Sequence, residues 1–116
     1  MKDFKRLIVW QKSFQLFIDC HKFCKKLPAE EKYELGSQLR RAVFSIPANI
    51  AEGSAKATNA HKKIFLENSL GSSYEVETAL LGIIELYPGL KEDCEQKLGI
   101  CMEIQKMLIA LINKLM

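Results

Sequence analysis

Apolar residues recur every three or four positions along four long stretches of the chain, which is the period of one face of an α-helix. The first stretch predicts a helix from Ile8 to Lys26 that ends at Leu27-Pro28, because a residue before proline avoids the helical conformation. It carries two neighbouring apolar stripes, which merge into an arc of about 200°. One stripe holds Leu7, Trp10, Phe14, Phe17, His21 and Cys24, and the other holds Val9, Leu16, Cys20, Phe23 and Leu27.

The second predicted helix opens at Pro28, with proline in its first turn and Glu30 and Glu31 near its positive end. Its core stripe consists of Leu35, Leu39, Ala42, Val43, Ile46 and Ile50. Pro47 lies inside this pattern, and we expect it to kink the helix rather than to end it. Residues 53–59 form the next connection, where Thr58 or Asn59 caps the third helix.

The third helix is expected from about Ala60 to Tyr87, and the fourth from Lys91 to Lys114, after the break at Pro88-Gly89. Four helices joined by short connections predict an all-α protein with an up-down-up-down four-helix bundle. Its 116 residues suffice for one domain, residues 1–116.

The first and fourth helices are more apolar than a monomeric bundle needs. Their arcs of about 200° and 220° are roughly twice the width that faces a core. Surface apolar patches of that extent are rare in monomers, so we expect a homo-oligomer. Leu16 and Ile109 are expected to point outward, toward the neighbouring copy.

The amino-acid composition indicates the class of protein and its location in the cell. Hydrophobic residues make up 48% and charged residues 27%, and no apolar run is long enough to span a membrane. The apolar stretch from Leu7 to Trp10 is too short for a signal peptide, so we expect a cytoplasmic protein.

Charge is unevenly distributed along the chain. Residues 1–63 hold 13 Lys and Arg against 6 Asp and Glu, a net +7, whereas residues 64–116 hold 4 against 8, a net −4. This asymmetry favours an anionic partner or contacts between unlike surfaces of several copies, although unequally charged solvated faces would give it too.

The four cysteines, Cys20, Cys24, Cys94 and Cys101, all fall at apolar positions, where a thiol behaves as a small hydrophobic group. Cys20, His21 and Cys24 lie close enough together to suggest a metal site, but the paired motifs of structural zinc sites are missing. We therefore expect buried thiols, with no metal and no cofactor.

The second helix also carries a polar stripe, and the third helix carries a matching set of polar and small residues. The stripe holds Glu34, Gln38, Arg41, Ser45, Asn49, Glu52 and Lys56, and the matching set holds Asn68, Gly71, Ser72, Glu75 and Gly82. We call these two sets the polar seam. A turn near residue 57 places Arg41 near Glu75, so we expect an ion pair in a buried or half-buried seam. A structural network that sets helix register is favoured over a binding or catalytic groove.

Three motifs resemble those of the bacterial family of 23S rRNA intervening-sequence proteins, a family similar to the accessory proteins of diversity-generating retroelements. They are the segment from Phe4 to Lys12, the segment from Tyr33 to Gly53, and Gly71-Ser72-Ser73-Tyr74-Glu75. The most distinctive part is the run Ser45-Ile46-Pro47-x-Asn49-Ile50-Ala51-Glu52-Gly53. The resemblance implies a left-handed four-helix bundle, assembly into a ring that is typically a homopentamer, and binding of structured RNA or DNA. Gln38, Arg41, Asn49, Glu52 and Glu75 match the family pattern, which assigns them no chemistry.

Three functions can be compared. Binding of structured RNA or DNA would use basic residues, for which the candidates are Lys22, Lys25, Lys26, Arg40, Lys56, Lys62 and Lys63. A protein-interaction scaffold, for instance for a reverse transcriptase, remains the alternative, since the pI of about 8.7 is below that of most strong nucleic-acid binders. Catalysis is disfavoured, because the carboxylates Glu52 and Glu75 have no accompanying nucleophile, base or phosphate-binding loop.

Overall fold

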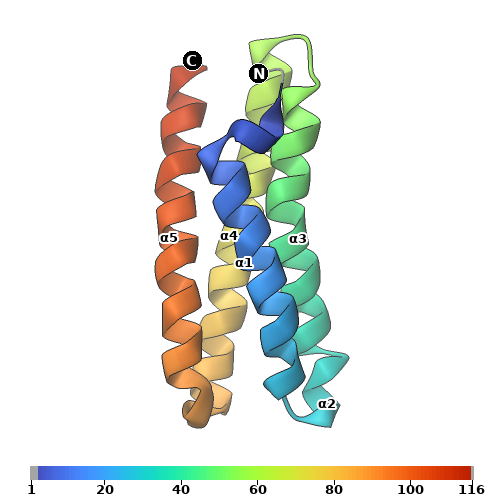
Figure 1. The fold of residues 1–116 in the computed structure, drawn as a ribbon, viewed down its shortest axis with the longest axis vertical. Coiled ribbons are helices and arrows are strands. Elements are labelled where there is room, and N and C mark those ends of the chain that lie inside the picture. Colours follow the sequence, from blue (N-terminus) through green and yellow to red (C-terminus); the bar gives the residue numbers. More distant parts are fainter. Residues whose placement is uncertain (1–2, 116) are drawn as a thin grey trace.

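The computed structural model describes residues 3–115, and every regular element in that range is a helix (Figure 1). The four long helices are α1 (Ile8–Phe23), α3 (Leu35–Ser54), α4 (Asn59–Leu86) and α5 (Lys91–Lys114). The short elements are η1 (Phe4–Arg6), η2 (Cys24–Lys26), α2 (Ala29–Lys32) and η3 (Pro88–Leu90). The prediction of an all-α four-helix bundle is confirmed.

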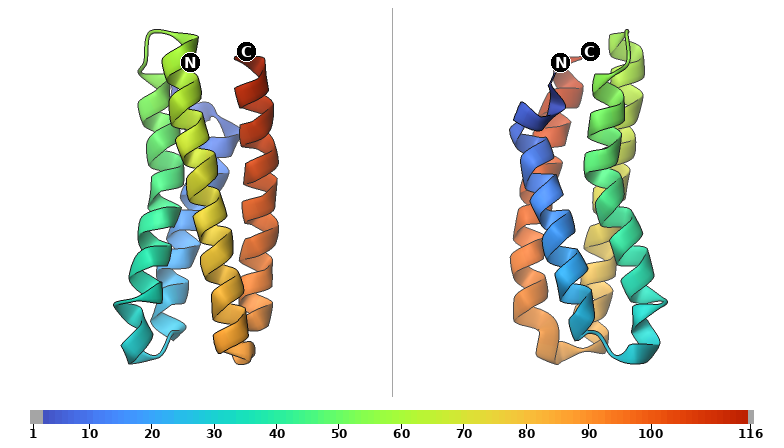
Figure 2. Two further views of the ribbon diagram at one scale, coloured as in Figure 1. Left: turned by 180° about the vertical axis from the view of Figure 1, so that it is seen from behind. Right: turned by 45° about the vertical axis from the view of Figure 1, so that its right-hand side comes forward.

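Successive long helices run in opposite directions along an elongated molecule of 44 × 21 × 20 Å (Figure 1). Helices α1 and α4 each pack against α3 and α5. Both chain ends and the α3–α4 turn lie at one end of the bundle, and α2 and the α4–α5 turn lie at the other (Figure 2). The left-handed sense of the bundle stays a prediction.

Local signals place most helix ends where the sequence predicts them. Helix α1 begins at Ile8, and the extended backbone of Leu27 before Pro28 ends the segment that follows it. Thr58 caps α4, since its Oγ1 accepts a hydrogen bond of 3.2 Å from the His61 backbone amide. The last turn after Phe23 is the 3₁₀ segment η2, which tightens the end of the predicted first helix.

The prediction of one continuous second helix is wrong, because the helix is interrupted at Tyr33 and Glu34, which separate α2 from α3. At this break the Arg40 side chain donates a hydrogen bond of 3.0 Å to the Lys32 carbonyl, which has no helical partner there. Gly36, one residue into α3, is buried so tightly that a Cβ would lie 3.3 Å from the Glu31 carbonyl oxygen. Side-chain and packing contacts from outside the periodic pattern therefore hold the break.

Helix α3 continues through Pro47, as predicted, although proline cannot donate a backbone hydrogen bond there. The carbonyl of the preceding Ile46 accepts a hydrogen bond of 2.8 Å from the Ser69 hydroxyl of α4. Both Pro47 and Ser69 are buried. A side chain of the neighbouring helix thus ties α4 to α3 at the irregular position.

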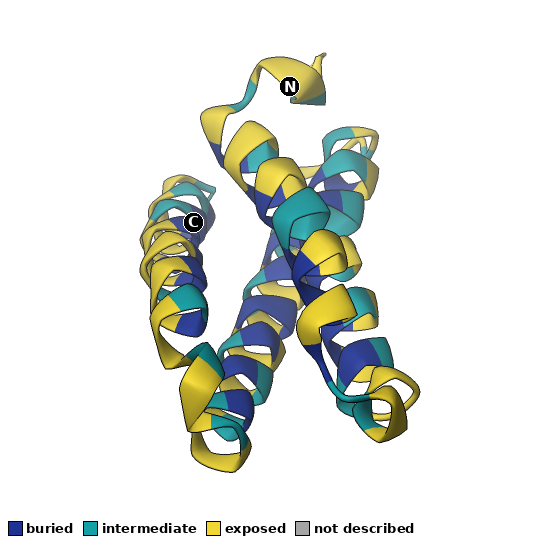
Figure 3. Ribbon diagram, turned by 60° about the horizontal axis from the view of Figure 1, so that its bottom comes forward, coloured by how far each residue is buried: buried dark blue, intermediate teal, exposed yellow. Residues whose placement is uncertain are grey.

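The core lies between the four long helices, with buried residues facing inward and exposed residues facing outward (Figure 3). Burying a Leu, Ile or Phe side chain stabilises the fold by roughly 1.5–3 kcal/mol. The second predicted stripe supplies the fully buried residues of α1, whereas Trp10 and Phe17 of the first stripe are partly buried against the core. The expectation that Leu16 points outward is wrong, since Leu16 is 0% exposed. Ile109, by contrast, is 40% exposed, as expected.

Candidate nucleic-acid interface

The polar seam is a hydrogen-bonded network over only part of its length. The Ser72 hydroxyl donates to the Ser45 hydroxyl at 2.8 Å, which joins α4 to α3. The Asn49 amide donates to both the hydroxyl and the carbonyl of Ser45, each at 2.8 Å. Ser72 is buried, and Ser45 and Asn49 are half-buried. This part of the seam ties α3 to α4 through side-chain hydrogen bonds.

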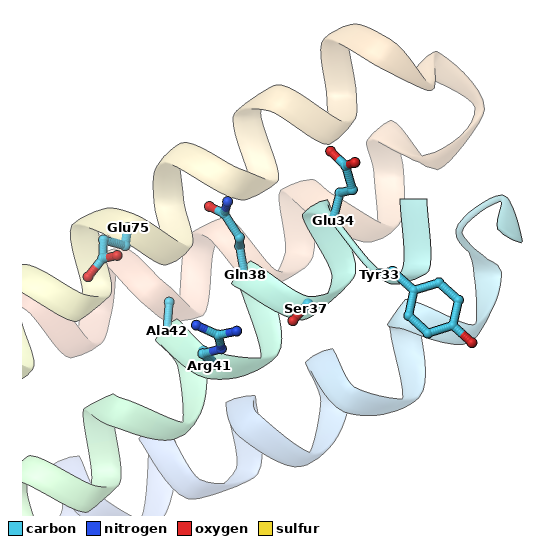
Figure 4. A pocket seen from close by; sticks show the side chains of 7 residues that line it. All are labelled: Tyr33, Glu34, Ser37, Gln38, Arg41, Ala42 and Glu75. Carbon is cyan, nitrogen blue, oxygen red and sulfur yellow. The ribbon is translucent and has the colours of Figure 1, made fainter. Parts of the chain in front are cut away.

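Nearer the α2 end, the seam opens into a hollow of about 450 Å³ between α3 and α4 (Figure 4). Its lining consists of Tyr33, Glu34, Ser37, Gln38, Arg41, Ala42 and Glu75. Arg41 and Glu75 both line it, as the predicted helix register implies, but both are exposed. The predicted ion pair between them is wrong, since no nitrogen of Arg41 lies within 4.0 Å of a carboxylate oxygen of residues 3–115.

A second hollow, of about 490 Å³, continues along the same side of the bundle and shares Gln38, Ala42 and Glu75 with the first. Gly71 and Gly82 line it, and a Cβ added at either would meet no atom within 4 Å. The two hollows together form an open groove whose charged side chains have room around them. We call it the α3–α4 groove.

Within the described part of the chain, no group of three His, Cys, Asp or Glu side chains could hold a metal ion. Glu52, the other carboxylate considered for acid–base chemistry, is exposed and does not line the groove that contains Glu75. The carboxylates that line the groove are therefore Glu34 and Glu75, and not the pair of Glu52 and Glu75 that the sequence suggested.

The four cysteines are buried free thiols, as the sequence predicts. Burial raises the pKa of Cys20 and of Cys101 to about 12, and that of Cys94 to about 11. Burial also raises the pKa of the Cys24 thiol, although the nearby Arg40 guanidinium opposes this. These thiols stay protonated at neutral pH and so are poor nucleophiles and metal ligands.

The seven basic residues predicted to bind nucleic acid are divided between the two ends of the bundle. Lys22, Lys25, Lys26 and Arg40 lie toward the end with α2, together with the acidic residues Glu30, Glu31, Glu34, Glu92 and Asp93. There the Lys26 ammonium pairs with the Asp93 carboxylate at 2.7 Å. Local positive charge at this end is therefore largely neutralised.

At the other end, Lys56, Lys62 and Lys63 gather around the α3–α4 turn. The Lys62 ammonium donates to the Lys56 carbonyl at 2.6 Å, and the Lys56 ammonium lies 4.8 Å from the centre of the Phe65 ring. These contacts hold the turn in a defined shape.

The chain termini add three cations at the same end, which sequence reasoning did not select. Lys5 and Arg6 lie on η1, and Lys114 ends α5. We call these three residues, with Lys56, Lys62 and Lys63, the basic end. Its described acidic residues are Asp3, which pairs with Arg6 at 3.8 Å, and Glu52. The alternating helix directions already implied this meeting of the termini and the turn.

A further surface lies on α1 and α3. Trp10 stacks on Phe14 with ring centres 4.9 Å apart, and the Phe17 and Phe44 rings meet edge to face at 5.3 Å. Phe14 is 41% and Phe44 54% exposed. We call Trp10, Phe14, Phe17 and Phe44 the aromatic surface, which includes members of the first predicted stripe of α1. His21, in the same stripe, is exposed and borders it.

No described helix is long and apolar enough to cross a membrane. The sequence profile of the 23S rRNA-intervening sequence protein family matches residues 5–110. The fold is similar to the crystal structure of a protein of unknown function from the S23 ribosomal protein family of Bacteroides thetaiotaomicron, with a TM-score of 0.84 and 25% identity over 90% of this chain and 98% of the other. No curated protein matches the chain.

Proposed function

The chain belongs to the 23S rRNA-intervening sequence protein family, and from that premise we propose that it is a non-catalytic cytoplasmic protein that binds structured RNA or DNA. The carrying observation is the basic end, which brings together Lys5 and Arg6 of η1, Lys56 of the α3–α4 turn, Lys62 and Lys63 of α4, and Lys114 of α5. When Lys and Arg side chains neutralise the phosphates of a nucleic acid, the cations bound to those phosphates are released into solution. This release favours binding.

This contact would depend on charge and shape more than on base sequence. Lysines supply most of the cations at the basic end, and a lysine binds phosphate as a point charge rather than reading a base edge in a fixed geometry. Affinity should therefore fall steeply as salt rises.

The test is a titration of a structured rRNA fragment and of duplex DNA between about 50 and 200 mM salt. A triple variant that neutralises the three lysines around the α3–α4 turn, Lys56→Gln, Lys62→Gln and Lys63→Gln, should bind both nucleic acids more weakly. It should also flatten the slope of log affinity against log salt by about 0.7–0.9 for each phosphate that the variant no longer neutralises.

The matched control neutralises three exposed lysines toward the opposite end, Lys22→Gln, Lys25→Gln and Lys32→Gln. Both variants lose the same net charge, so a difference between them reports on the basic end itself. Equal effects of the two variants, or no binding at low salt, would contradict the proposal.

We also propose that several copies assemble, with five in a ring favoured. The aromatic surface and the exposed Met102 and Ile109 of α5 offer apolar area that a monomer rarely leaves in water. A ring would repeat the basic end and add avidity to each phosphate contact.

A protein-interaction scaffold remains the second candidate, and the α3–α4 groove favours it. The side chains of Arg41 and Glu75 make no ion pair within residues 3–115, so both are open to a partner of mixed charge. Absence of nucleic-acid binding at low salt would make this the better function.

A further inference from the structure

An apolar slot of about 430 Å³ lies between the start of α1 and the end of α5. Its walls are formed by Leu7, Ile8, Val9, Met107, Ala110 and Leu111, and the charged residues Arg6 and Lys114 complete its lining. The slot is open to solvent, since Ile8 is 59% exposed and Ala110 is exposed as well. It lies at the end of the bundle where Figure 1 marks both chain termini.

The slot is part of the basic end, because Arg6 and Lys114 belong to both. An apolar space flanked by two cations suits an occupant with an apolar face and negative charge on either side. An unpaired nucleobase has this character, since its flat faces are poorly hydrated and its strand carries a phosphate on each side. An arginine guanidinium can also stack on a base or contact its phosphate.

Duplex nucleic acid does not offer such an occupant along its length. Its bases are stacked on one another, and their faces are covered. Loops, bulges and strand ends present unstacked bases that a protein can take up. A slot that takes up an unstacked base would therefore favour loops, bulges and strand ends over a continuous duplex, although the charge of the basic end attracts both.

We propose that the slot receives an unpaired base of the bound nucleic acid, so that the protein prefers a hairpin loop or bulge to a continuous duplex. This inference rests on the proposed function and specifies its ligand. Lys56, Lys62 and Lys63 hold the phosphates of the paired stem, and Arg6 and Lys114 hold those beside the inserted base.

The experiment compares two RNA probes with the same number of phosphates, a stem-loop with unpaired loop bases and a continuous duplex. Removing a base face of roughly 40 Å² from water against an aliphatic wall corresponds to about a five-fold gain in affinity. The wild-type protein should therefore bind the stem-loop about five-fold more tightly than the duplex. A fluorescent base analogue placed in the loop should change its emission on binding.

Ala110→Leu fills the slot without changing charge, and Ala110→Ser at the same exposed position is the matched control. The leucine variant should lose the preference for the stem-loop while its duplex affinity and salt dependence stay those of the wild type. The serine variant should keep the preference.

Equal affinity of the wild type for the two probes would overturn the base slot and leave the proposed function standing. Failure of both probes to bind at low salt would overturn both. If Ala110→Leu changes only the number of copies in the assembly and leaves the stem-loop preference intact, a neighbouring copy occupies the slot and the inference is wrong.

Discussion

Gly53 and Gly71 are both helical glycines, but their surroundings differ. A Cβ at Gly53 of α3 would lie 2.9 Å from the Cβ of Phe65 on α4, closer than nonbonded carbon atoms approach. A Cβ at Gly71 of α4 would meet no atom within 4 Å. Each glycine is followed by serine in the sequence, so only the partner helix separates a required glycine from a replaceable one.

Gly53→Ala should therefore destabilise the fold by about 1–3 kcal/mol, because Phe65 or the α3–α4 spacing must shift. Gly71→Ala should raise the free energy of unfolding by about 0.5–1 kcal/mol, since alanine restricts the unfolded chain and favours helix. Urea unfolding of the two variants and of the wild type measures whether the free energy of unfolding falls in Gly53→Ala and rises in Gly71→Ala. A Gly53→Ala protein as stable as the wild type would mean that α3 and α4 are not in such close contact.

The buried thiols give a second residue-scale prediction. Because burial raises the pKa of Cys20 and Cys101 to about 12, a thiol-specific disulfide reagent at mildly alkaline pH should leave both unmodified in the folded protein. All four cysteines should react once the chain is unfolded. Rapid reaction of Cys20 or Cys101 without unfolding would contradict their burial.

The same shifts set a pH dependence of stability. A thiol whose pKa is raised on folding adds stability that is fully present below the ordinary value of 9.0 and is lost as pH rises toward 12. The fold should therefore weaken above pH 9.0, and less so in a Cys20→Ala variant. Denaturant titrations at a series of pH values measure this loss for both proteins.

At the scale of elements, α1 is joined to α5 by a charged cluster at the α2 end. The Asp93 carboxylate accepts hydrogen bonds from Lys26 of η2 and from Lys97 one turn along α5. Lys97 is buried, and its ammonium lies 4.9 Å from the centre of the Phe23 ring. Burial opposes ionisation of Asp93, but the two lysines outweigh it and lower its pKa below 3.8.

Asp93→Asn should destabilise the protein by about 3 kcal/mol at neutral pH, because it leaves the buried Lys97 ammonium without its carboxylate. Lys26→Met, which removes the more exposed lysine, should cost at most about 1 kcal/mol. Chemical denaturation of both variants and the wild type measures the difference.

The contribution of Asp93 to stability depends on pH in the opposite direction to that of the buried thiols. A carboxyl group whose pKa is lowered on folding adds stability that is present above its ordinary value of 3.8 and is lost as pH falls through the folded value. The gap between wild type and Asp93→Asn should therefore close below pH 3.8. A gap that persists in strong acid would show that the ion pairs are not its origin.

At the scale of the whole molecule, the exposed apolar residues predict assembly. Phe44→Glu on the aromatic surface and Ile109→Glu on α5 should each reduce the mass measured by light scattering, since a carboxylate would be buried at the contact. Circular dichroism should stay that of the wild type. Leu16→Glu should instead unfold the chain, because Leu16 lies in the core.

Gln96→Glu adds the same charge at an exposed position of α5 outside the aromatic surface, and should leave the mass unchanged. A wild-type protein that is monomeric at micromolar concentration would contradict the assembly altogether.

The sequence determined the elements and most of their ends because those depend on neighbours in the chain. Helical periodicity, the proline at Pro28 and the Thr58 cap are short-range signals, and the structure agrees with each. Burial of the cysteines followed from the same periodicity. The break at Tyr33 and Glu34 escaped it, since the Arg40 hydrogen bond to the Lys32 carbonyl and the burial of Gly36 leave no mark in the apolar periodicity.

Tertiary structure alone decided how each helix is rotated about its axis and which side chains contact one another. An apolar arc of about 200° on α1 allows either stripe to face the core, and packing chose the one with Leu16. Helix register placed Arg41 and Glu75 at one hollow, yet both long side chains extend into solvent rather than toward each other. The basic end joins Lys5, Lys56 and Lys114, which are far apart in the chain. Alternating helix directions imply that these residues lie at one end, but the contacts of Lys56 with Lys62 and Phe65 are set by tertiary packing.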